Sequence, residues 1–470
     1  MSFTIFNTLT RRLEEFSPLQ GNEVSMYCCG PTVHNFAHIG NFRTFVFSDL
    51  FRRYLEFRGF NVRHVMNITD VEDKIIASVR QNGRPLKEFT GEYEKAFLED
   101  FDLLNCKRPH DLPHATDFIP QIITLIEKLM ARGIAYRASD GSVYFSISKY
   151  IGCGCKYGQL VNLNFEEMRV GERVSSDEYA KESVADFALW KARVPEDGEI
   201  SWASPWGEGR PGWHIECSAM SMDLLGNSFD LHLGGEDLAF PHHEDEIAQS
   251  EGAGLQKPGE KFVKYWAHVA HLLVEGKKMA KSLGNFFTLR DLVAKGFQGR
   301  EVRFLLLAAH YRESFNFTLE GLHGARTALN RIDEQLLKLR ELAGGEKGTP
   351  NPQVMAQFTE LMDDDLNVSG AWGSLFEWVR DTNRLISESR FLPHDAANAL
   401  ATWEQIDAVF AILKKAETEE VPQELIDLLE QRQTARKAKD FKRSDAIRDE
   451  LKAKGWVIED TPKGPRLKKI

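Results

Sequence analysis

The segment from 240 to 250 reads FPHHEDEIAQS and places two histidines and three acids side by side. On a helix, His242 and Glu246 stand four residues apart and share a face, whereas His243 and Glu244 point elsewhere. One imidazole and one carboxylate on a single face make half of a metal site. The alternative is a charged, solvated helix start, where acids favour the positive end of the helix dipole. The segment therefore needs partners from elsewhere in the chain.

Two further segments carry residue types that suit phosphate chemistry. HIGN at 38–41 opens a helix, where free backbone N–H groups and the helix dipole can bind a phosphate. Gly40 would let a nucleotide approach the backbone, and His38 could donate a hydrogen bond to a phosphoryl oxygen. KKMAKSLGN at 277–285 offers a lysine loop that can neutralise charge on a transferring phosphate. Taken alone, each segment also fits an ordinary capped helix or a solvated lysine turn.

The composition indicates a globular protein with several domains. The chain has 470 residues, of which 42% are hydrophobic, and only six cysteines. It shows no secretory signal, no membrane-spanning run and no disulfide framework, so we expect a soluble cytoplasmic protein. The net charge is −11, but residues 431–470 contain 13 Lys and Arg against 6 Asp and Glu. A basic tail on an acidic body suggests that a polyanion docks at one end.

The apolar pattern predicts the elements that must position these residues. Strands over 22–30 and 60–69 flank a helix over 38–59, and together they form a βαβ unit. Residues 228–249 repeat the order of strand, glycine loop and helix. The glycine loop and the helix start should lie at the carboxyl edge of a parallel sheet, where such folds bind ligands.

The last third of the chain has a different pattern. Segments 319–343 and 354–415 are long, charged and amphipathic, which predicts a helical bundle. Residues 417–424 read as a linker. They lead to a basic helix over 424–454 and to a short end that could form a β-hairpin.

Together the motifs resemble a known family. HIGN and KMAKS are similar to the HIGH and KMSKS signatures of class I aminoacyl-tRNA synthetases. Within that class, the chain resembles the cysteinyl-tRNA synthetase family across nearly its whole length. The stretches that carry the resemblance are YCCGPTVHNFAHIGNFRTF, NITDVEDKI, DFALWK, GRPGWHIECSAM, FPHHEDEIAQSE, KMAKSLGNFFTLRDL and DFKRSDAIRDEL.

The resemblance implies one zinc ion in the amino-acid pocket. The matching ligands are Cys29, Cys217, His242 and Glu246. Zinc accepts thiolate, imidazole and carboxylate ligands, and it would favour the sulfur of cysteine over the hydroxyl of serine. The family ligand stands directly before the glycine, which selects Cys29 over Cys28. Cys153 and Cys155 lie outside the family pattern, and we interpret them as free thiols.

The resemblance also implies the remaining site residues. Those on the cysteine side are Gly30, Thr69, Trp213 and His232. Those that bind ATP are His38, Gly40, Asn41, Gly235, Asp237 and Lys281. The catalytic residues are His38, Asn41, Lys278 and Lys281. Two positions depart from the signatures: Asn41 replaces the last histidine of HIGH and cannot carry a positive charge, and Ala280 replaces the first serine of KMSKS.

The function implied by the resemblance is that of a monomeric cysteine–tRNA ligase. It would activate L-cysteine with ATP and Mg²⁺ to cysteinyl-adenylate, and then transfer cysteine to the 3′ end of tRNA(Cys). The alternative is a zinc-dependent, ATP-using ligase that joins cysteine to an amino sugar, which would not need a long helical and basic extension. A zinc hydrolase would need an HExxH-like arrangement, and a non-catalytic RNA-binding module would not need four dispersed ligands.

The expected fold class is α/β. A Rossmann-like nucleotide-binding catalytic domain with an inserted connective subdomain should precede an α-helical bundle and a small C-terminal α+β domain. The expected ranges are 1–115 and 201–250 for the two catalytic halves, 116–200 for the connective insertion, 251–315 for a stem-contact region with the KMSKS-like loop, 316–418 for the tRNA-binding bundle and 419–470 for a basic anticodon-binding domain.

Overall fold

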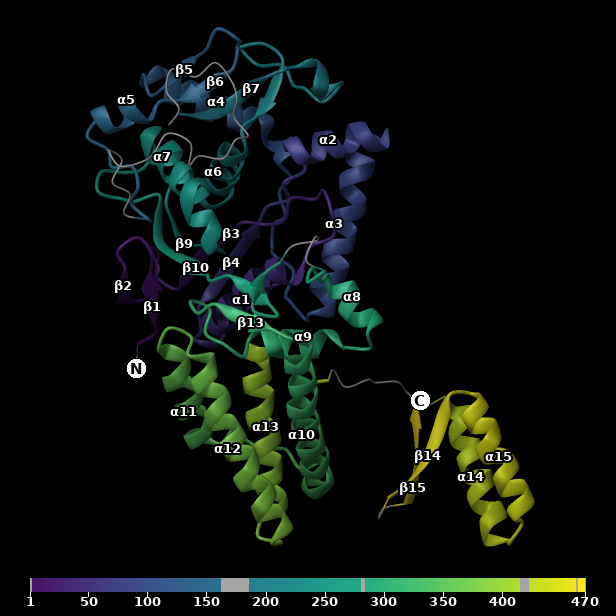
Figure 1. Ribbon diagram of the computed structural model, residues 1–470. Helices are drawn as coiled ribbons and strands as arrows, with labels where there is room; N and C mark the ends of the chain where they lie inside the picture. Colours follow the sequence, from purple (N-terminus) through teal and green to yellow (C-terminus); the bar gives the residue numbers. More distant parts are fainter. Residues whose placement is uncertain (1, 162–185, 280–283, 415–421, 462–463, 470) are drawn as a thin grey trace. The chain divides into compact units, whose positions relative to one another are not determined.

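The computed structural model describes residues 2–161, 186–279, 284–414, 422–461 and 464–469 (Figure 1). The contacts divide the chain into two compact units, residues 1–413 and 414–470, and each is described by itself. In the described ranges, no helix is both long enough and apolar enough to cross a membrane.

A four-stranded parallel sheet lies in the larger unit. Its strands are β3 (Glu23–Cys28), β4 (Asn61–Met66), β9 (Phe229–Gly235) and β10 (Val263–Val269), in the order β10-β9-β3-β4. The strands are rich in apolar residues because both faces of a parallel sheet are covered. The chain moves from β3 outward to β4, and from β9 outward in the opposite direction to β10. At such a reversal the carboxyl ends of the strands leave a crevice for ligands.

Helix α1 (Ile39–Phe57) connects β3 to β4, which confirms the predicted βαβ unit. The two signature residues at its start cap one another. His38 Nδ1 accepts from the Asn41 N–H at 3.1 Å, and Asn41 Oδ1 accepts from the His38 N–H at 3.2 Å. Phe42 and Val46 are fully buried further along the helix. The packing of α1 therefore fixes where its N-terminal N–H groups lie.

The second half of the sheet contains the acidic segment. Strand β9 continues into two short turns, η4 (Glu236–Leu238) and η5 (Ala239–His243), and then into α7 (Glu244–Gly252). Phe240 has an extended backbone (φ −145°, ψ 132°), so the turns and α7 do not form one regular helix. The predicted order of strand, glycine loop and helix is confirmed, but His242 lies in the irregular turn before α7.

A second sheet and several helices lie between β4 and β9. The helices are α2 (Asp73–Asn82), α3 (Leu86–Leu103), η1 (Ala115–Phe118), α4 (Ile119–Ala131), α5 (Ile147–Gly152), η3 (Pro195–Asp197) and α6 (Trp213–Leu225). The strands are β5 (Ala135–Arg137), β6 (Val143–Phe145), β7 (Phe187–Ala192) and β8 (Gly209–Pro211), all antiparallel in this order. The last helix of this group, α6, packs beside α7 (Figure 1).

Short elements follow β10 and also open the chain. They are the hairpin β1 (Thr4–Asn7) and β2 (Arg12–Glu15), the sheet of β11 (Leu272–Val274), β12 (Lys277–Lys278) and β13 (Phe315–Phe317), and helices α8 (Leu289–Ala294) and α9 (Gly299–Leu306). Arg43 on α1 ties this region to the helix. Its guanidinium donates to the carbonyls of Ala270 (2.8 Å), His271 (3.0 Å) and His310 (3.0 Å).

Four long helices complete the larger unit. They are α10 (Leu319–Ala343), α11 (Pro352–Asp363), α12 (Val368–Ser387) and α13 (Pro393–Phe410). The predicted helix over 319–343 is confirmed, and the predicted helical segment 354–415 consists of three helices. Buried residues of this bundle, such as Trp372 and Phe410, belong to the same apolar core as those of α1. The bundle and the parallel sheet thus share a hydrophobic core.

A buried arginine reinforces this shared core. Arg303 on α9 is fully buried and pairs with Asp49 of α1 at 2.6 Å. Its other N–H groups donate to the carbonyls of Leu104 (3.0 Å) and Phe410 (2.6 Å). Moving any one of these partners away would leave a buried guanidinium partly uncompensated, which costs free energy of folding. The arginine therefore holds α9, α1 and the end of α13 together.

The smaller unit contains α14 (Gln423–Lys437), α15 (Phe441–Ala453), β14 (Trp456–Thr461) and β15 (Gly464–Lys469). The predicted hairpin is confirmed, but the single basic helix predicted over 424–454 is wrong. Lys439 adopts a left-handed backbone (φ 58°), and the Asp440 side chain caps the second helix by accepting from the Arg443 N–H at 3.0 Å. The predicted linker over 417–424 lies mostly outside the described residues.

Candidate functional site

Four side chains from three segments meet at the carboxyl edge of the parallel sheet. Cys29 directly follows β3, Cys217 lies on α6, and His242 and Glu246 lie in η5 and α7. Their possible ligand atoms all lie within 4.8 Å of one another. His242 Nε2 is 3.0 Å from Glu246 Oε1, and Cys29 Sγ is 3.8 Å from the same oxygen. We call these four residues the metal cluster.

The metal cluster is buried. Glu246 is 0% exposed, His242 2%, Cys217 1% and Cys29 6%. A charged and solvated helix start would leave these acids in water, so that alternative is wrong. Buried polar groups of this kind need partners or a bound ion.

The four side chains of the metal cluster shift one another's pKa values. A hydrogen bond with Cys29 lowers the pKa of Cys217 to about 6, although burial acts in the opposite direction. Burial would lower the pKa of His242, but hydrogen bonds with Cys217 and Glu246 raise it to about 10. Burial likewise opposes ionisation of Glu246, but the charges of His232 and His242 bring its pKa down to about 2. Cys217 and Glu246 therefore hold their ligand forms, a thiolate and a carboxylate, at neutral pH. A metal would have to displace a proton from His242, and another from Cys29, whose pKa burial raises.

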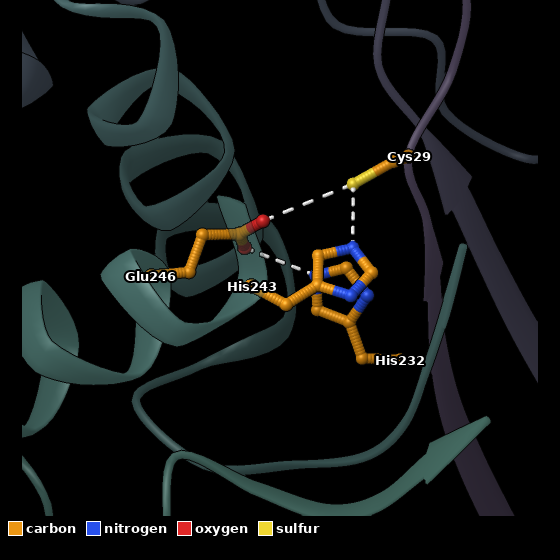
Figure 2. Close-up of side chains that lie close together, drawn as sticks. All are labelled: Cys29, His232, His243 and Glu246. Carbon is orange, nitrogen blue, oxygen red and sulfur yellow. Dashed lines mark hydrogen bonds and ion pairs between the residues drawn. The ribbon is translucent and has the colours of Figure 1, made fainter. Parts of the chain in front are cut away.

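A second group of side chains shares two members with the metal cluster. Figure 2 shows Cys29 and Glu246 together with His232 and His243, and these four also bring their ligand atoms within 4.8 Å. Cys29 Sγ lies 3.3 Å from His243 Nε2, and His232 Nε2 lies 3.0 Å from Glu246 Oε2. The prediction that His243 points away from the site is therefore wrong. The Nδ1 atom of His243 lies 2.8 Å from His268 Nε2, so the His243 ring connects the Cys29 thiol to the buried His268.

Two residues that the sequence did not single out orient His242. His214 Nδ1 lies 2.8 Å from His242 Nδ1, and His214 Nε2 lies 3.5 Å from Asp245 Oδ2. This arrangement leaves Nε2 of His242 facing Glu246 and the thiols. Metal-binding histidines commonly use their second nitrogen in this way, which fixes the ring and its tautomer. In the sequence, only their positions inside the matched stretches GWHIEC and FPHHEDE could have pointed to His214 and Asp245.

The predicted cysteine-pocket residues surround the metal cluster. Trp213 is 38% exposed, and its ring centroid lies 4.4 Å from that of His242. His232 stacks on Trp266 at 4.5 Å. A side chain on Gly30 would collide with the backbone, because its Cβ would lie 1.8 Å from the Asn67 carbonyl oxygen.

Asn67 connects Gly30 and Thr69, two residues predicted for the cysteine pocket. Its Oδ1 accepts from the Gly30 N–H at 2.8 Å, and its amide donates to the Thr69 hydroxyl at 3.0 Å. Sequence reasoning missed Asn67, which lies inside the predicted strand over 60–69 but directly after the end of the observed strand β4. The structure thus brings Gly30 and Thr69 to the same edge as Cys29.

The two signature segments also meet in space. The Ile39 N–H donates to the Phe287 carbonyl at 3.0 Å, and the rings of His38 and Phe286 lie edge to face at 5.3 Å. On the other side, a Cβ on Gly40 would lie 2.7 Å from the Met279 methyl group. The segments before and after 280–283 therefore both contact the start of α1. Lys278 lies exposed in β12, whereas Lys281 and Ala280 lie outside the described residues.

The predicted adenosine-side residues lie close to His38. Gly235 ends β9, and a Cβ there would lie 2.5 Å from Asp237 Oδ1. Burial lowers the pKa of His38, and the negative charge of Asp237 only partly offsets this effect. Without a bound nucleotide His38 is therefore mainly neutral at pH 7, and its ring N–H can donate a hydrogen bond to a phosphate oxygen.

Family comparisons agree with this arrangement. Residues 15–327 match the model of the class I (C) tRNA synthetase catalytic domain, residues 357–414 match the DALR domain, and residues 418–465 match the cysteinyl-tRNA ligase anticodon binding domain. A cysteine–tRNA ligase of Chlamydia muridarum is 47% identical over 100% of both chains. That of Chlamydia pneumoniae is 46% identical over 99% of this chain and 98% of its own. The chain belongs to the cysteine–tRNA ligase family.

Solved structures of other class I synthetases share the family fold. The methionyl-tRNA synthetase of Mycobacterium tuberculosis in complex with methionyl-adenylate has a TM-score of 0.58 and 14% identity, over 83% of this chain and 90% of that chain. A leucyl-tRNA synthetase complex of Agrobacterium radiobacter has a TM-score of 0.59 and 11% identity, over 84% of each chain. These findings confirm the predicted Rossmann-like class I fold with helical C-terminal domains.

Family membership also confirms the prediction of an aminoacyl-tRNA ligase of the cysteine type. The comparisons do not support the alternative ligase that joins cysteine to an amino sugar. Cys153 is exposed and Cys155 half-buried, and both are free thiols. Within the described ranges, neither belongs to a group of side chains that could hold a metal.

Proposed function

We propose that this cytoplasmic, monomeric protein activates L-cysteine with ATP and transfers it to the 3′ end of tRNA(Cys). The observation that carries the proposal is the buried metal cluster beside the two signature segments. The four side chains of the metal cluster and the capped start of α1 lie at one edge of one sheet. Such an edge is where folds of this type bind their ligands.

The residues of the metal cluster fit zinc. Two thiols, one imidazole and one carboxylate make a donor set that zinc accepts, with room for a further ligand from the substrate. When bound, zinc would supply a soft Lewis acid that prefers the thiol of cysteine to the hydroxyl of serine. Cys29, Cys217, His242 and Glu246 would hold it, as the family resemblance implies.

Two observations favour this set over the group that contains His232 and His243. The metal cluster provides two thiols, and Cys217 has a lowered pKa that suits a ligand. His232 contacts Oε2 of Glu246, and the other oxygen, Oε1, faces His242 of the metal cluster. We assign His232 to the wall of the cysteine pocket.

Activation requires the cysteine carboxylate to attack the α-phosphate of ATP in line. The Gly40 N–H in the first turn of α1 and the ring of His38 would hold the phosphate oxygens. Asn41 keeps His38 in place through the reciprocal cap. Lys278 and Lys281 would neutralise the charge on the leaving pyrophosphate, with Mg²⁺ entering as part of the ATP substrate. A terminal ribose hydroxyl of tRNA would then attack the carbonyl carbon of the adenylate, which forms the cysteinyl ester and releases AMP.

This activity is tested by cysteine-dependent exchange of pyrophosphate into ATP, followed by charging of total tRNA. We expect exchange that depends on cysteine and is at least about 100-fold weaker with serine. Charging should require tRNA, and glucosamine should not replace it as acceptor. Exchange without any dependence on cysteine would refute the proposal.

Gly40 gives a more local test of the nucleotide site. Gly40→Ala should lower the exchange rate roughly 10-fold, because displaced groups around a reacting phosphate cost rate steeply. The new Cβ would lie 2.7 Å from the Met279 methyl group and 3.0 Å from the His38 ring. Steady-state kinetics in ATP measure the effect.

The double variant Gly40→Ala/Met279→Ala serves as the control, because removing the methionine makes room for the new methyl group. It should recover part of the lost rate relative to Gly40→Ala. Full activity of the single variant would show that the contact between the two signature segments has no role.

A further inference from the structure

Tyr27 carries a buried hydroxyl group that has no hydrogen-bond partner among the described residues. The residue lies on β3, two positions before Cys29, and its side chain is 0% exposed. A hydroxyl buried without a partner costs free energy of folding. Phenylalanine would fill the same space without this cost, so the hydroxyl group needs an explanation.

The sheet places Tyr27 on the face that carries the metal cluster. Cys29 continues the ladder of β3, because its N–H donates to the Leu233 carbonyl at 3.1 Å. Side chains two positions apart on a strand share a face, so Tyr27 and Cys29 point to the same side. On β9, Tyr27 pairs with His232, and the two rings lie 5.1 Å apart. His232 in turn contacts Glu246 Oε2 at 3.0 Å.

Helix α6, which carries Cys217, covers this part of the sheet. The helix packs against β3, and the side chains of Tyr27, Cys29 and Cys217 belong to one buried core. Among the charged groups around the Tyr27 hydroxyl, the Cys217 thiolate acts on it most strongly, ahead of Cys29 and Glu246. The strength of such an interaction falls with distance, so the hydroxyl lies closest to the sulfur of Cys217.

The Tyr27 hydroxyl keeps its proton at neutral pH. Burial raises the pKa of Tyr27 well above its ordinary value, and the negative charge of Cys217 raises it further. A neutral phenol offers one O–H donor, and a thiolate sulfur can accept it. Such a hydrogen bond favours the charged form of the acceptor. It would therefore help Cys217 to stay in the thiolate form that a metal requires.

We propose that Tyr27 is a positioning residue of the metal cluster, and that its hydroxyl donates a hydrogen bond to the Cys217 sulfur when that sulfur binds zinc. The inference rests on the zinc site of the proposed function. Partners of this kind orient a metal ligand and strengthen binding, typically by about 10- to 100-fold in affinity. Tyr27 would thus act on cysteine selection through Cys217, without contact to the substrate.

The test is the variant Tyr27→Phe in the full-length chain, which removes the hydroxyl and keeps the ring. Competition with a chromophoric chelator at neutral pH should show zinc binding about 10-fold weaker than in wild type. With Co²⁺ in place of zinc, the sulfur-to-metal charge-transfer band should move to lower energy, because the sulfur loses a hydrogen bond. Neither measurement depends on cysteine activation.

Tyr150→Phe is the matched control. Tyr150 on α5 is also 0% exposed, and within the described ranges its hydroxyl likewise has no hydrogen-bond partner. Because Tyr150 lies outside the metal cluster, its variant should keep the zinc affinity and the cobalt spectrum of wild type. Without metal, Tyr27→Phe should melt no lower than wild type, whereas its gain in melting temperature on zinc loading should be smaller.

A zinc affinity within about twofold of wild type, together with an unshifted cobalt band, would overturn the role of Tyr27. So would a Tyr27→Phe chain that does not fold, or that melts lower by the same amount with and without zinc, because the hydroxyl would then serve the fold itself. A wild-type protein that binds neither metal would instead refute the zinc site of the proposed function.

Discussion

Replacing Cys217 with serine is expected to remove the bound zinc and to lower cysteine-dependent pyrophosphate exchange at least about 100-fold. Cys217 is 1% exposed and contributes one of the two thiols of the metal cluster. A serine hydroxyl fills nearly the same space but does not ionise at neutral pH, so the fold should survive while the ligand is lost. Metal analysis of the purified variant and its exchange kinetics measure the two effects.

His243→Asn is the matched control for this prediction, because His243 belongs to the second group of side chains and not to the metal cluster. Its zinc content should stay near one per chain. If His243→Asn loses zinc while Cys217→Ser retains it, the ion is held by the second group. Melting temperatures of both variants separate loss of metal from loss of fold.

A chain that ends at Leu413 is expected to form cysteinyl-adenylate at nearly the normal rate but to charge tRNA at least about 100-fold less efficiently. The cut falls at the boundary between the two compact units and leaves the metal cluster and both signature segments in place. Residues 431–470 alone contain 13 of the chain's Lys and Arg residues. Because phosphate contacts release counterions, the full-length protein's tRNA affinity should also fall more steeply with salt.

Phe441→Ala in the full-length chain refines this prediction. Phe441 is 63% exposed at the start of α15, beside Lys442 and Arg443, and such a ring can stack on an unpaired base. The variant should charge tRNA roughly 10-fold less well at limiting tRNA, with unchanged pyrophosphate exchange. Unchanged charging by the shortened chain would show that residues 414–470 do not contribute to tRNA binding.

The regular elements could be predicted because their patterns are local. The spacing of apolar residues placed α1 and α10 within two residues of their observed ends. Ligands that stand beside a glycine or four residues apart, such as Cys29, His242 and Glu246, could also be carried over from the family. Their convergence at one sheet edge follows from the parallel arrangement of β3 and β9.

Side-chain direction outside regular helices could not be predicted. A straight helix would turn His243 away, but the irregular turn η5 places it against Cys29. The tail shows the same difficulty. An aromatic residue in a basic tail, such as Trp456, is an obvious candidate for stacking on a base, but Trp456 is buried in a small core with Leu451.

Arg303 limits how freely parts of this protein can be exchanged with those of its relatives. The arginine comes from α9, its carboxylate partner Asp49 from α1, and one of its carbonyl partners, Phe410, from the end of α13. A bundle transplanted from another synthetase would have to present a carbonyl at the same point, or leave a buried guanidinium partly unsatisfied. The catalytic fold and the bundle are therefore not interchangeable modules, and Arg303 and Asp49 must be substituted together.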